Sequence, residues 1–191
     1  SNVSHELRSP LASVKAMVET LENGALDERE LTRDFLQRIH RDVDRMDHIV
    51  NDLLELSRLE SGQVPLHLSP MDLRSLIEEV AARFGSQTRS KDITLHLVLP
   101  DVLPLVIGQK EKLRQVLVNL LENAVKFTPA QGRVTLSSEA QDRFVQVHVK
   151  DNGIGIAREH LLHVFERFYK VDRARHDDGT GLGLAIVNHI I

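Results

Sequence analysis

Hydrophobic positions in the N-terminal third of the chain follow a helical period. Apolar side chains recur at steps of three or four from Val3 to Leu21, and Asn23-Gly24 then gives a helix-stop signal. A second run with the same period extends over residues 27–61. Two amphipathic helices joined by a short loop predict an αα-hairpin. A lone hairpin leaves apolar surface uncovered, so the pattern predicts a homodimer in which two hairpins form a four-helix bundle.

A further apolar row widens the stripe of the second helix. It consists of Leu36, Val43, Val50 and Leu54. The second helix should be longer than the first by about 18 Å at ~1.5 Å per residue, and we expect the first helix to continue upstream in a parent protein. Pro10 cannot donate a hydrogen bond to the Glu6 carbonyl, so a bend or loosening of the first helix is expected there.

The hydrophobic pattern changes near residue 66. Beyond it the sequence predicts helices at 74–84, 111–127, 158–165 and from 183, and strands at 93–99, 105–107, 133–137 and 143–150. A charged loop is expected over 171–179. Helices mixed with hairpins predict an α+β chain, in which a helical hairpin (1–64) precedes an α/β sandwich domain with a mixed sheet (65–191).

Composition narrows the function classes. The chain has 24 basic and 28 acidic side chains, and residues 1–66 carry a net −5 whereas 67–191 carry +1. This balance gives no sign of nucleic-acid binding, and we interpret the acidic hairpin as a solvated face. The absence of cysteine excludes disulfides and cysteine-based metal sites or nucleophiles. No apolar run reaches the ~20 residues that span a bilayer.

Two candidate motifs lie on helices. His5 is followed by Glu6, and an imidazole beside a carboxylate can act as a nucleophile that loses its proton during attack. Asn119, Asn123 and Lys126 share one face of the predicted helix over 111–127, a pattern that suits phosphate and hydrated Mg²⁺. By themselves, both patterns are also compatible with ordinary solvated helix surfaces.

Two glycine-containing motifs follow. Asp151, at the end of a strand, is followed by glycines at 153 and 155, and its carboxylate can accept a hydrogen bond from a purine amino group. An ordinary turn is the alternative. Residues 179–184 read GTGLGL and lead into a helix, which suits an anion. They match neither a Walker A motif nor a Rossmann fingerprint.

In their order along the chain, these motifs resemble the catalytic core of sensor histidine kinases of two-component systems. The resemblance rests on SHELRSPL at 4–11, NLLENAVKF at 119–127, DNGIG at 151–155, FERFY at 165–169 and GTGLGL at 179–184. It implies that 1–64 form the dimerisation and histidine-phosphotransfer hairpin. It also implies that 65–191 form the ATP-binding domain shared with gyrase, Hsp90 and the MutL-type mismatch-repair ATPases.

The resemblance also implies residue roles. His5 would be phosphorylated by ATP, Glu6 would take or share its proton, and Ser9 would help to dephosphorylate the regulator. Asn123, with Asn119 close by, would hold Mg²⁺ on the phosphates, and Asp151 would read adenine. The remaining nucleotide contacts would come from Lys126, Phe127, Gly153, Gly155, Tyr169, Lys170, Thr180, Gly181, Leu182, Gly183 and Leu184. Residues 156–178 would form a lid anchored by Phe165 and Phe168.

The implied partners are a second copy of the chain and the receiver domain of a response regulator, whose aspartate would accept the phosphate. An ATP hydrolase of the same superfamily and a degenerate nucleotide-sensing scaffold are the alternatives. Those hydrolases carry a glutamate base where this chain has Asn119, and without it water is poorly activated. Whether phosphorylation occurs within one subunit or between two stays open.

Some positions depart from the family pattern. Phe127 stands where tyrosine is common, and Ser9 where threonine or asparagine is common. Ile191 lies inside a predicted helix, so we expect a C-terminally truncated domain. The family also leads us to expect a cytoplasmic catalytic portion of a membrane-anchored sensor.

Overall fold

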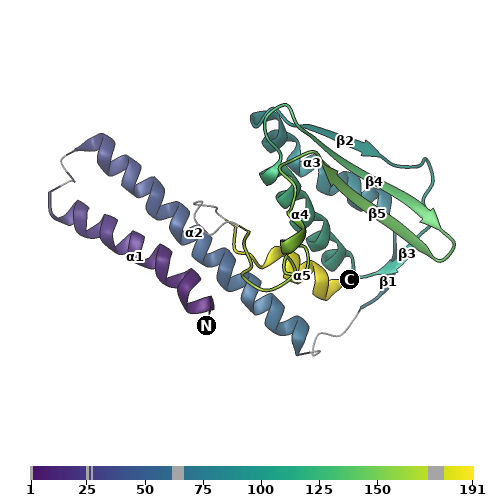
Figure 1. Ribbon diagram of the computed structural model, residues 1–191, viewed down its shortest axis with the longest axis horizontal. Helices are drawn as coiled ribbons and strands as arrows, with labels where there is room; N and C mark the ends of the chain where they lie inside the picture. Colours follow the sequence, from purple (N-terminus) through teal and green to yellow (C-terminus); the bar gives the residue numbers. More distant parts are fainter. Residues whose placement is uncertain (1, 25, 27, 62–66, 172–178) are drawn as a thin grey trace.

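A two-helix hairpin forms the N-terminal part of the structure. The computed structural model describes residues 2–24, 26, 28–61, 67–171 and 179–191. Helices α1 (Asn2–Glu22) and α2 (Arg29–Glu60) run antiparallel, side by side (Figure 1). Pro10, where a bend or loosening was expected, is buried, and helix α1 continues through it without a break. The predicted hairpin is confirmed, whereas the predicted domain boundary lies outside the described residues.

The second part of the chain is a mixed α/β unit. Its helices are α3 (Leu73–Ser90), α4 (Lys110–Phe127) and α5 (Gly183–Ile190). Its strands are β1 (Ser69–Met71), β2 (Thr94–Val98), β3 (Val106–Gly108), β4 (Arg133–Gln141) and β5 (Phe144–Asp151). Strand β2 pairs parallel to β4, and β4 pairs antiparallel to β5, while β1 and β3 form a separate antiparallel pair. The predicted mixed sheet and α+β class are therefore confirmed.

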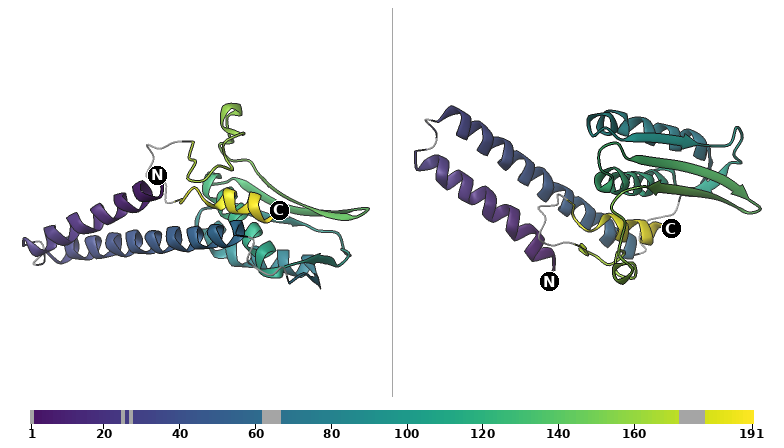
Figure 2. Two further views of the ribbon diagram at one scale, coloured as in Figure 1. Left: turned by 90° about the horizontal axis from the view of Figure 1, so that it is seen from below. Right: turned by 45° about the horizontal axis from the view of Figure 1, so that its top comes forward.

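Alternation along the strands explains why one face of the sheet is covered. Val134 and Leu136 of β4 are fully buried, and the valines of β5 point to the same side. They pack against α3 and α4, which lie as a layer on that face (Figure 2). Helix α3 begins where the Asp72 carboxylate accepts a hydrogen bond from the Ser75 N–H at 3.2 Å, a regular N-cap.

The helix predicted over 158–165 is wrong. The structure has only a single 3₁₀ turn at Arg158–His160, followed by turns. Leu161, Leu162 and Phe165 are exposed, so the apolar face of such a helix would have nothing to pack against. A short helix without tertiary packing is marginal in water.

Smaller differences concern the ends of elements. Strand β1 was not predicted, because three residues that include Pro70 give little strand signal. Helix α3 continues past Phe84 to Ser90, and β4 continues past Ser137 to Gln141, paired along its length with β5. The charged loop predicted over 171–179 lies mostly outside the described residues.

A second apolar cluster joins the two parts of the molecule. Leu56 of α2 is buried against Leu182 and Ile186, at the start of α5. Leu53, Leu59, Phe168 and Ile190 complete this cluster. Helix α5 thus lies between α4 and the C-terminal half of α2, as Figure 1 shows. Among the described residues, no helix has both the length and the apolar character needed to cross a membrane.

We expect Leu121→Ala to lower the free energy of unfolding by about 2–5 kcal/mol, because Leu121 is fully buried in the main core and alanine would leave a cavity. Urea denaturation followed by circular dichroism measures this. The matched control is Val102→Ala, whose side chain is 82% exposed and which should change little. Equal effects of the two substitutions would contradict the assignment of this core.

Candidate functional site

The first glycine motif is held against the end of α4. The Asp151 carboxylate accepts a hydrogen bond from the Gly153 N–H at 2.9 Å, and the Ile154 N–H donates to the Phe127 carbonyl at 3.2 Å. A Cβ atom on Gly153 would lie 2.4 Å from that carbonyl oxygen, so only glycine fits. The loop that carries Asp151 therefore adjoins the last turn of the asparagine-bearing helix.

The predicted polar face of α4 meets the second glycine motif. The Asn119 amide donates to the Gly183 carbonyl at 3.2 Å, and a Cβ atom on Gly179 would lie 2.6 Å from the Lys126 Nζ. Asn119, Asn123 and Lys126 are all half-buried, and the Lys126 Nζ lies 5.2 Å from the centroid of the Phe127 ring. Segments far apart in the sequence thus converge on one side of α4.

The second glycine motif is shaped by its contact with the predicted lid. Gly181 has φ +72°, and its carbonyl accepts a hydrogen bond from the Phe168 N–H at 2.8 Å. A Cβ atom at 181 would lie 2.8 Å from the Phe168 Cα, so side chains are excluded. The Leu182 N–H, predicted to face phosphate, donates here to the Thr180 hydroxyl oxygen at 3.2 Å.

The described part of the predicted lid is anchored by one phenylalanine, not two. Phe168 packs in the apolar cluster beside α2, whereas Phe165 is 46% exposed. The Tyr169 hydroxyl lies 2.7 Å from the His160 Nδ1, and its ring stacks on His163 with centroids 5.5 Å apart. Residues 172–178 of the predicted lid lie outside the described residues.

The predicted phospho-acceptor region lies on α1, where His5 and Ser9 are exposed. Glu6 is half-buried between two cations. The Lys170 ammonium donates a hydrogen bond to the Glu6 Oε2 at 2.6 Å, and an Arg45 guanidinium nitrogen lies 3.6 Å from the same atom. The structure therefore brings the predicted phosphate-binding Lys170 to the carboxylate beside His5.

The interpretation of the acidic hairpin as a solvated face is wrong for the C-terminal half of α2. Asp52 accepts a hydrogen bond from the Thr180 hydroxyl at 2.9 Å, and two ion pairs lie nearby. They are Glu55 with Lys112 and Glu60 with Arg167. In sequence these acids only flank the apolar row of Leu53, Leu56 and Leu59, a pattern that also fits a solvent-exposed helix edge.

Burial changes the acidity of this interface. Withdrawal from water raises the pKa of the Asp52 carboxyl, and this effect outweighs the lowering by the Thr180 hydrogen bond and by the nearby His48. Partial burial also raises the pKa of Glu122 on α4, and the charge of Asp52 adds to it. Within the described ranges, no group of three or more His, Cys, Asp or Glu side chains is placed to hold a metal ion.

The structure thus joins an α/β domain, in which two glycine motifs lie beside α4, to a helical hairpin that carries an exposed histidine. Two family models match the chain: the His Kinase A phospho-acceptor domain over residues 1–62, and the histidine kinase-, DNA gyrase B- and HSP90-like ATPase over 108–191. The chain belongs to the sensor histidine kinases, of which it represents the catalytic core.

Three similar proteins illustrate this membership. Drug sensory protein A of Synechocystis sp. is 39% identical over all of this chain, which spans only 30% of that relative. The solved structure of the Acinetobacter baumannii histidine kinase AdeS has a TM-score of 0.77 and 28% identity, over 97% of this chain and 85% of that one. Histidine kinase ThkA in complex with response regulator TrrA has a TM-score of 0.76 and 25% identity, over 88% of this chain and 49% of that one.

We expect Asp52→Asn to stabilise the folded chain at pH 8, because asparagine keeps an acceptor for Thr180 without burying a charge. A carboxyl whose pKa is raised by folding stabilises the folded state fully below its ordinary value of 3.8, and this contribution is lost as the pH rises through the raised pKa. The stability difference should therefore shrink as the pH falls toward about 4. Thermal unfolding between pH 4 and 8 measures it.

The control for this experiment is Asp47→Asn, on the exposed side of the same helix, which should show no such trend. A pH-independent difference for Asp52→Asn would mean that the substitution acts through packing and not through charge.

Proposed function

We propose that this chain transfers the γ-phosphate of ATP to His5 and then to an aspartate of a response regulator. The observation that carries the proposal is the contact between Lys170 and Glu6. It joins the described part of the predicted lid to the turn of α1 that carries His5, so the proposed nucleotide side and the proposed acceptor side of a phosphotransfer reaction meet. The two matching family models support the same pairing of functions.

The nucleotide would lie where α4 meets the two glycine loops. Asp151 would accept the adenine amino group, while Phe127, Gly153 and Gly155 would adjoin the base. Phosphate oxygens would be met by Lys126 and Lys170 and by the second glycine loop and its neighbours, namely Tyr169, Thr180, Gly181, Leu182, Gly183 and Leu184. For Leu182 this requires the N–H to leave the Thr180 hydroxyl.

The residues of α4 fit a magnesium ion bound through the phosphates. Asn119 and Asn123 offer amide oxygens on one face, and Mg²⁺ retains several waters and needs few protein ligands. When bound, Mg²⁺ would neutralise charge on the phosphate oxygens.

Phosphoryl transfer depends chiefly on positioning and charge neutralisation. A ring nitrogen of His5 would form a bond to the γ-phosphorus, the bond from that phosphorus to the bridging oxygen would break, and ADP would leave. Glu6 would take the imidazole proton. For this step the Glu6 carboxylate has to exchange its bond with Lys170 for one with His5, so the structure described here precedes or follows the reacting arrangement.

The alternative of an ATP hydrolase is disfavoured by Asn119. Its amide donates a hydrogen bond to the Gly183 carbonyl, and an amide has no basic site with which to activate water. A non-catalytic scaffold would not need a histidine and a carboxylate beside Lys170, the lysine proposed to bind phosphate.

The proposed partner is the receiver domain of a response regulator. ThkA, which shares the fold, was solved in complex with the regulator TrrA. Exposed His5 and Ser9 lie on one accessible stretch of α1, where an incoming aspartate can approach. We propose that Ser9 uses its hydroxyl to orient water when the phosphorylated regulator is dephosphorylated. Membrane anchoring of a longer, cytoplasmically oriented parent protein stays a prediction.

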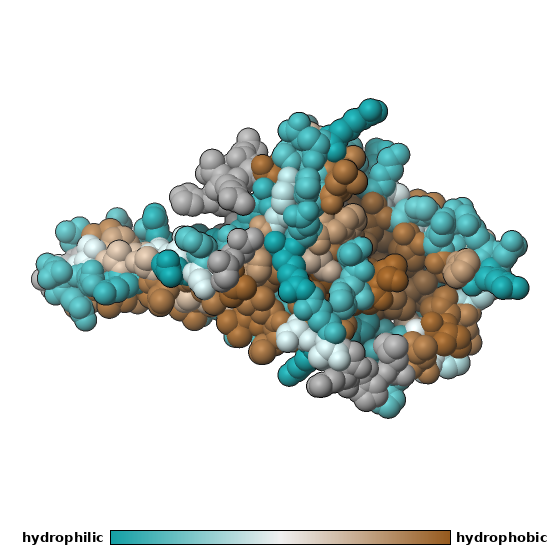
Figure 3. Space-filling model, turned by 60° about the horizontal axis from the view of Figure 1, so that its bottom comes forward, coloured by the Kyte–Doolittle hydropathy of each residue, from teal (hydrophilic) through white to brown (hydrophobic). Residues whose placement is uncertain are grey.

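We propose that a second copy covers the apolar row of the hairpin. Leu36, Val43, Val50 and Leu54 on α2 and Leu11 and Val18 on α1 are exposed in the single chain. Apolar surface gathers along the hairpin in Figure 3. Seven-residue steps within this row suit packing between parallel or antiparallel helices of a bundle.

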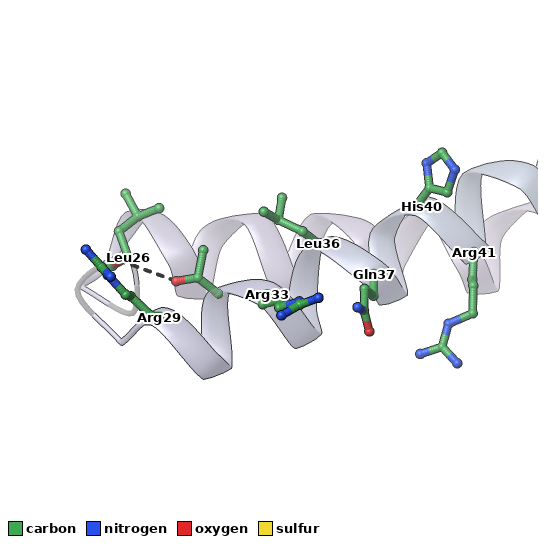
Figure 4. A pocket seen from close by; sticks show the side chains of 8 residues that line it. Leu26, Arg29, Arg33, Leu36, Gln37, His40 and Arg41 are labelled. Carbon is green, nitrogen blue, oxygen red and sulfur yellow. Dashed lines mark hydrogen bonds between the residues drawn. The ribbon is translucent and has the colours of Figure 1, made fainter.

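The far end of the hairpin adds a hollow to this surface. It measures about 920 Å³ and is lined by residues at the start of α2 and just before it (Figure 4). Leu26 and Leu36 contribute its apolar part, and Arg29, Arg33 and Arg41 also line it. Because Leu36 also belongs to the exposed row, we propose that this hollow closes when two hairpins pair.

We expect His5→Gln to abolish labelling of the chain by γ-labelled ATP and Mg²⁺, because the acceptor nitrogen is lost. Wild type should retain an acid-labile label, and the control His40→Gln, an exposed hairpin histidine, should retain it too. Asp151→Asn should also lose the label, through loss of nucleotide binding. Release of phosphate without any labelled wild-type protein would instead support the hydrolase.

We expect Val43→Glu to shift the chain from dimer to monomer, because it places a charge in the middle of the apolar row. Analytical ultracentrifugation at micromolar concentration measures this, with Asp44→Glu, on the neighbouring exposed position, as the control. A wild-type chain that sediments as a folded monomer would contradict the proposed bundle.

A further inference from the structure

Carboxylates of the hairpin bind two groups that the proposed function assigns to phosphate oxygens. Glu6 of α1 binds the Lys170 ammonium at 2.6 Å, and Asp52 of α2 binds the Thr180 hydroxyl at 2.9 Å. The Lys170 and Glu6 side chains are only 16% and 25% exposed, so water screens this pair less than it screens a surface pair. The hairpin thus presents anions at two positions proposed to receive phosphate oxygens.

The proposed adenine end is arranged differently. The Asp151 carboxylate is exposed, and the hydrogen bond described for it lies within its own loop. Lys126 belongs to α4 and lies beside Gly179, on the nucleotide side of the interface. The contacts with the hairpin that involve Lys170 and Thr180 therefore lie at the phosphate end of the site and leave the adenine end as it is.

We propose that Glu6 and Asp52 determine which nucleotide the docked chain accepts. Lys170 and Thr180 are the groups that would receive the third phosphate, and in the docked arrangement the two carboxylates withhold them. The site therefore takes adenosine and ADP but binds a third phosphate only by displacing these carboxylates. This inference rests on the proposed nucleotide site and adds its specificity: the hairpin discriminates between a nucleoside triphosphate and a diphosphate.

Competition between the two anions follows from the chemistry of the lysine. An ammonium forms its strongest hydrogen bonds with charged oxygens, and a carboxylate and a phosphate are alternative acceptors for the same N–H groups. Coupling of this kind is reciprocal. Docking should weaken binding of the triphosphate, and the triphosphate should weaken docking by the same factor.

Replacement of Glu6 by a phosphate as the partner of Lys170 also affects Glu6 itself. While Lys170 and Arg45 bracket its carboxylate, Glu6 is poorly placed to take a proton from His5. Transfer of Lys170 to a phosphate leaves Arg45, which lies on the same hairpin, as the cation beside Glu6. Arrival of the third phosphate therefore prepares the proton acceptor and the phosphate site together.

The ion pair of Glu55 with Lys112 allows docking to be changed without touching a proposed nucleotide or catalytic residue. It joins α2 to α4, and both side chains are mostly buried. Glu55→Lys and Lys112→Glu each place like charges together and should release the interface, whereas the double variant restores an opposite-charge pair. Glu30→Lys, at the far end of α2, makes the same charge change away from the interface and serves as the control.

Two readouts are needed. Calorimetric titration with a non-hydrolysable ATP analogue, ADP and adenosine gives the affinities. Energy transfer between dyes on Ser13→Cys of α1 and Gln146→Cys of β5, two exposed positions, reports docking, because the chain has no other cysteine. Labelled chain is diluted into excess unlabelled chain, so that a dimer carries one labelled subunit.

We expect each single reversal to lower energy transfer and to tighten binding of the ATP analogue by about fivefold, the factor that corresponds to one ion pair. Affinity for adenosine should not change, and affinity for ADP should change less than that for the analogue. The double variant and Glu30→Lys should resemble wild type. In wild type, the analogue should lower energy transfer and ADP should not. If a single reversal leaves the chain docked, a second variant combines Glu55→Lys with Glu60→Lys. It removes the α2 partner of Lys112 and the α2 partner of Arg167 together.

Two results would overturn the inference. One is an undocked variant that binds the ATP analogue no more tightly than wild type, and the other is wild-type energy transfer that does not respond to the analogue. Failure of the proposed function would look different, because no variant would bind adenosine, ADP or the analogue at all.

Discussion

Leu182 connects the two parts of this molecule, because its side chain packs against the hairpin while its backbone forms part of the glycine loop of the other part. The side chain is fully buried against Leu56 of the hairpin, while the backbone belongs to the glycine loop at the start of α5. The loop therefore cannot change position without disturbing this contact. Burial of an apolar side chain of this size contributes about 1.5–3 kcal/mol. A cluster of three buried side chains is thus strong enough to dock the domain and small enough to be released.

The ion pairs around this cluster determine how the domain is oriented on the hairpin more than they stabilise the docked state. Partly exposed pairs contribute little net stability, typically under about 1 kcal/mol each, but misplaced charges at a closed interface are costly. The hairpin supplies the acids Asp52, Glu55 and Glu60, and the ATPase domain supplies Lys112 and Arg167. This distribution, with acids on the hairpin and basic residues on the other domain, agrees with the excess of acids in residues 1–66. The same burial that orients the interface raises the pKa of Asp52.

Much of the fold and of the candidate site could be predicted because the relevant signals are local. The helix at 111–127 and the strand at 93–99 carry long periodic patterns, and they appear as α4 and β2 with small changes at their ends. The glycine motifs have local requirements as well: Gly181 needs a positive φ and Gly153 needs room beside a carbonyl. Where tertiary packing decided the outcome, prediction failed, as in the helix expected over 158–165.

The sequence by itself determined most of the helices and strands, the order of the motifs and the family, since these depend on periodicity, capping and glycine placement among neighbouring residues. Only the tertiary structure decided that Glu6 meets Lys170 and that Asp52 meets Thr180. These pairs are 164 and 128 residues apart. An acidic residue on an amphipathic helix looks the same in sequence whether it faces water or a docked domain. Its partner depends on how the apolar surfaces of the hairpin and of the second domain pack together, and no pattern among neighbouring residues predicts that packing.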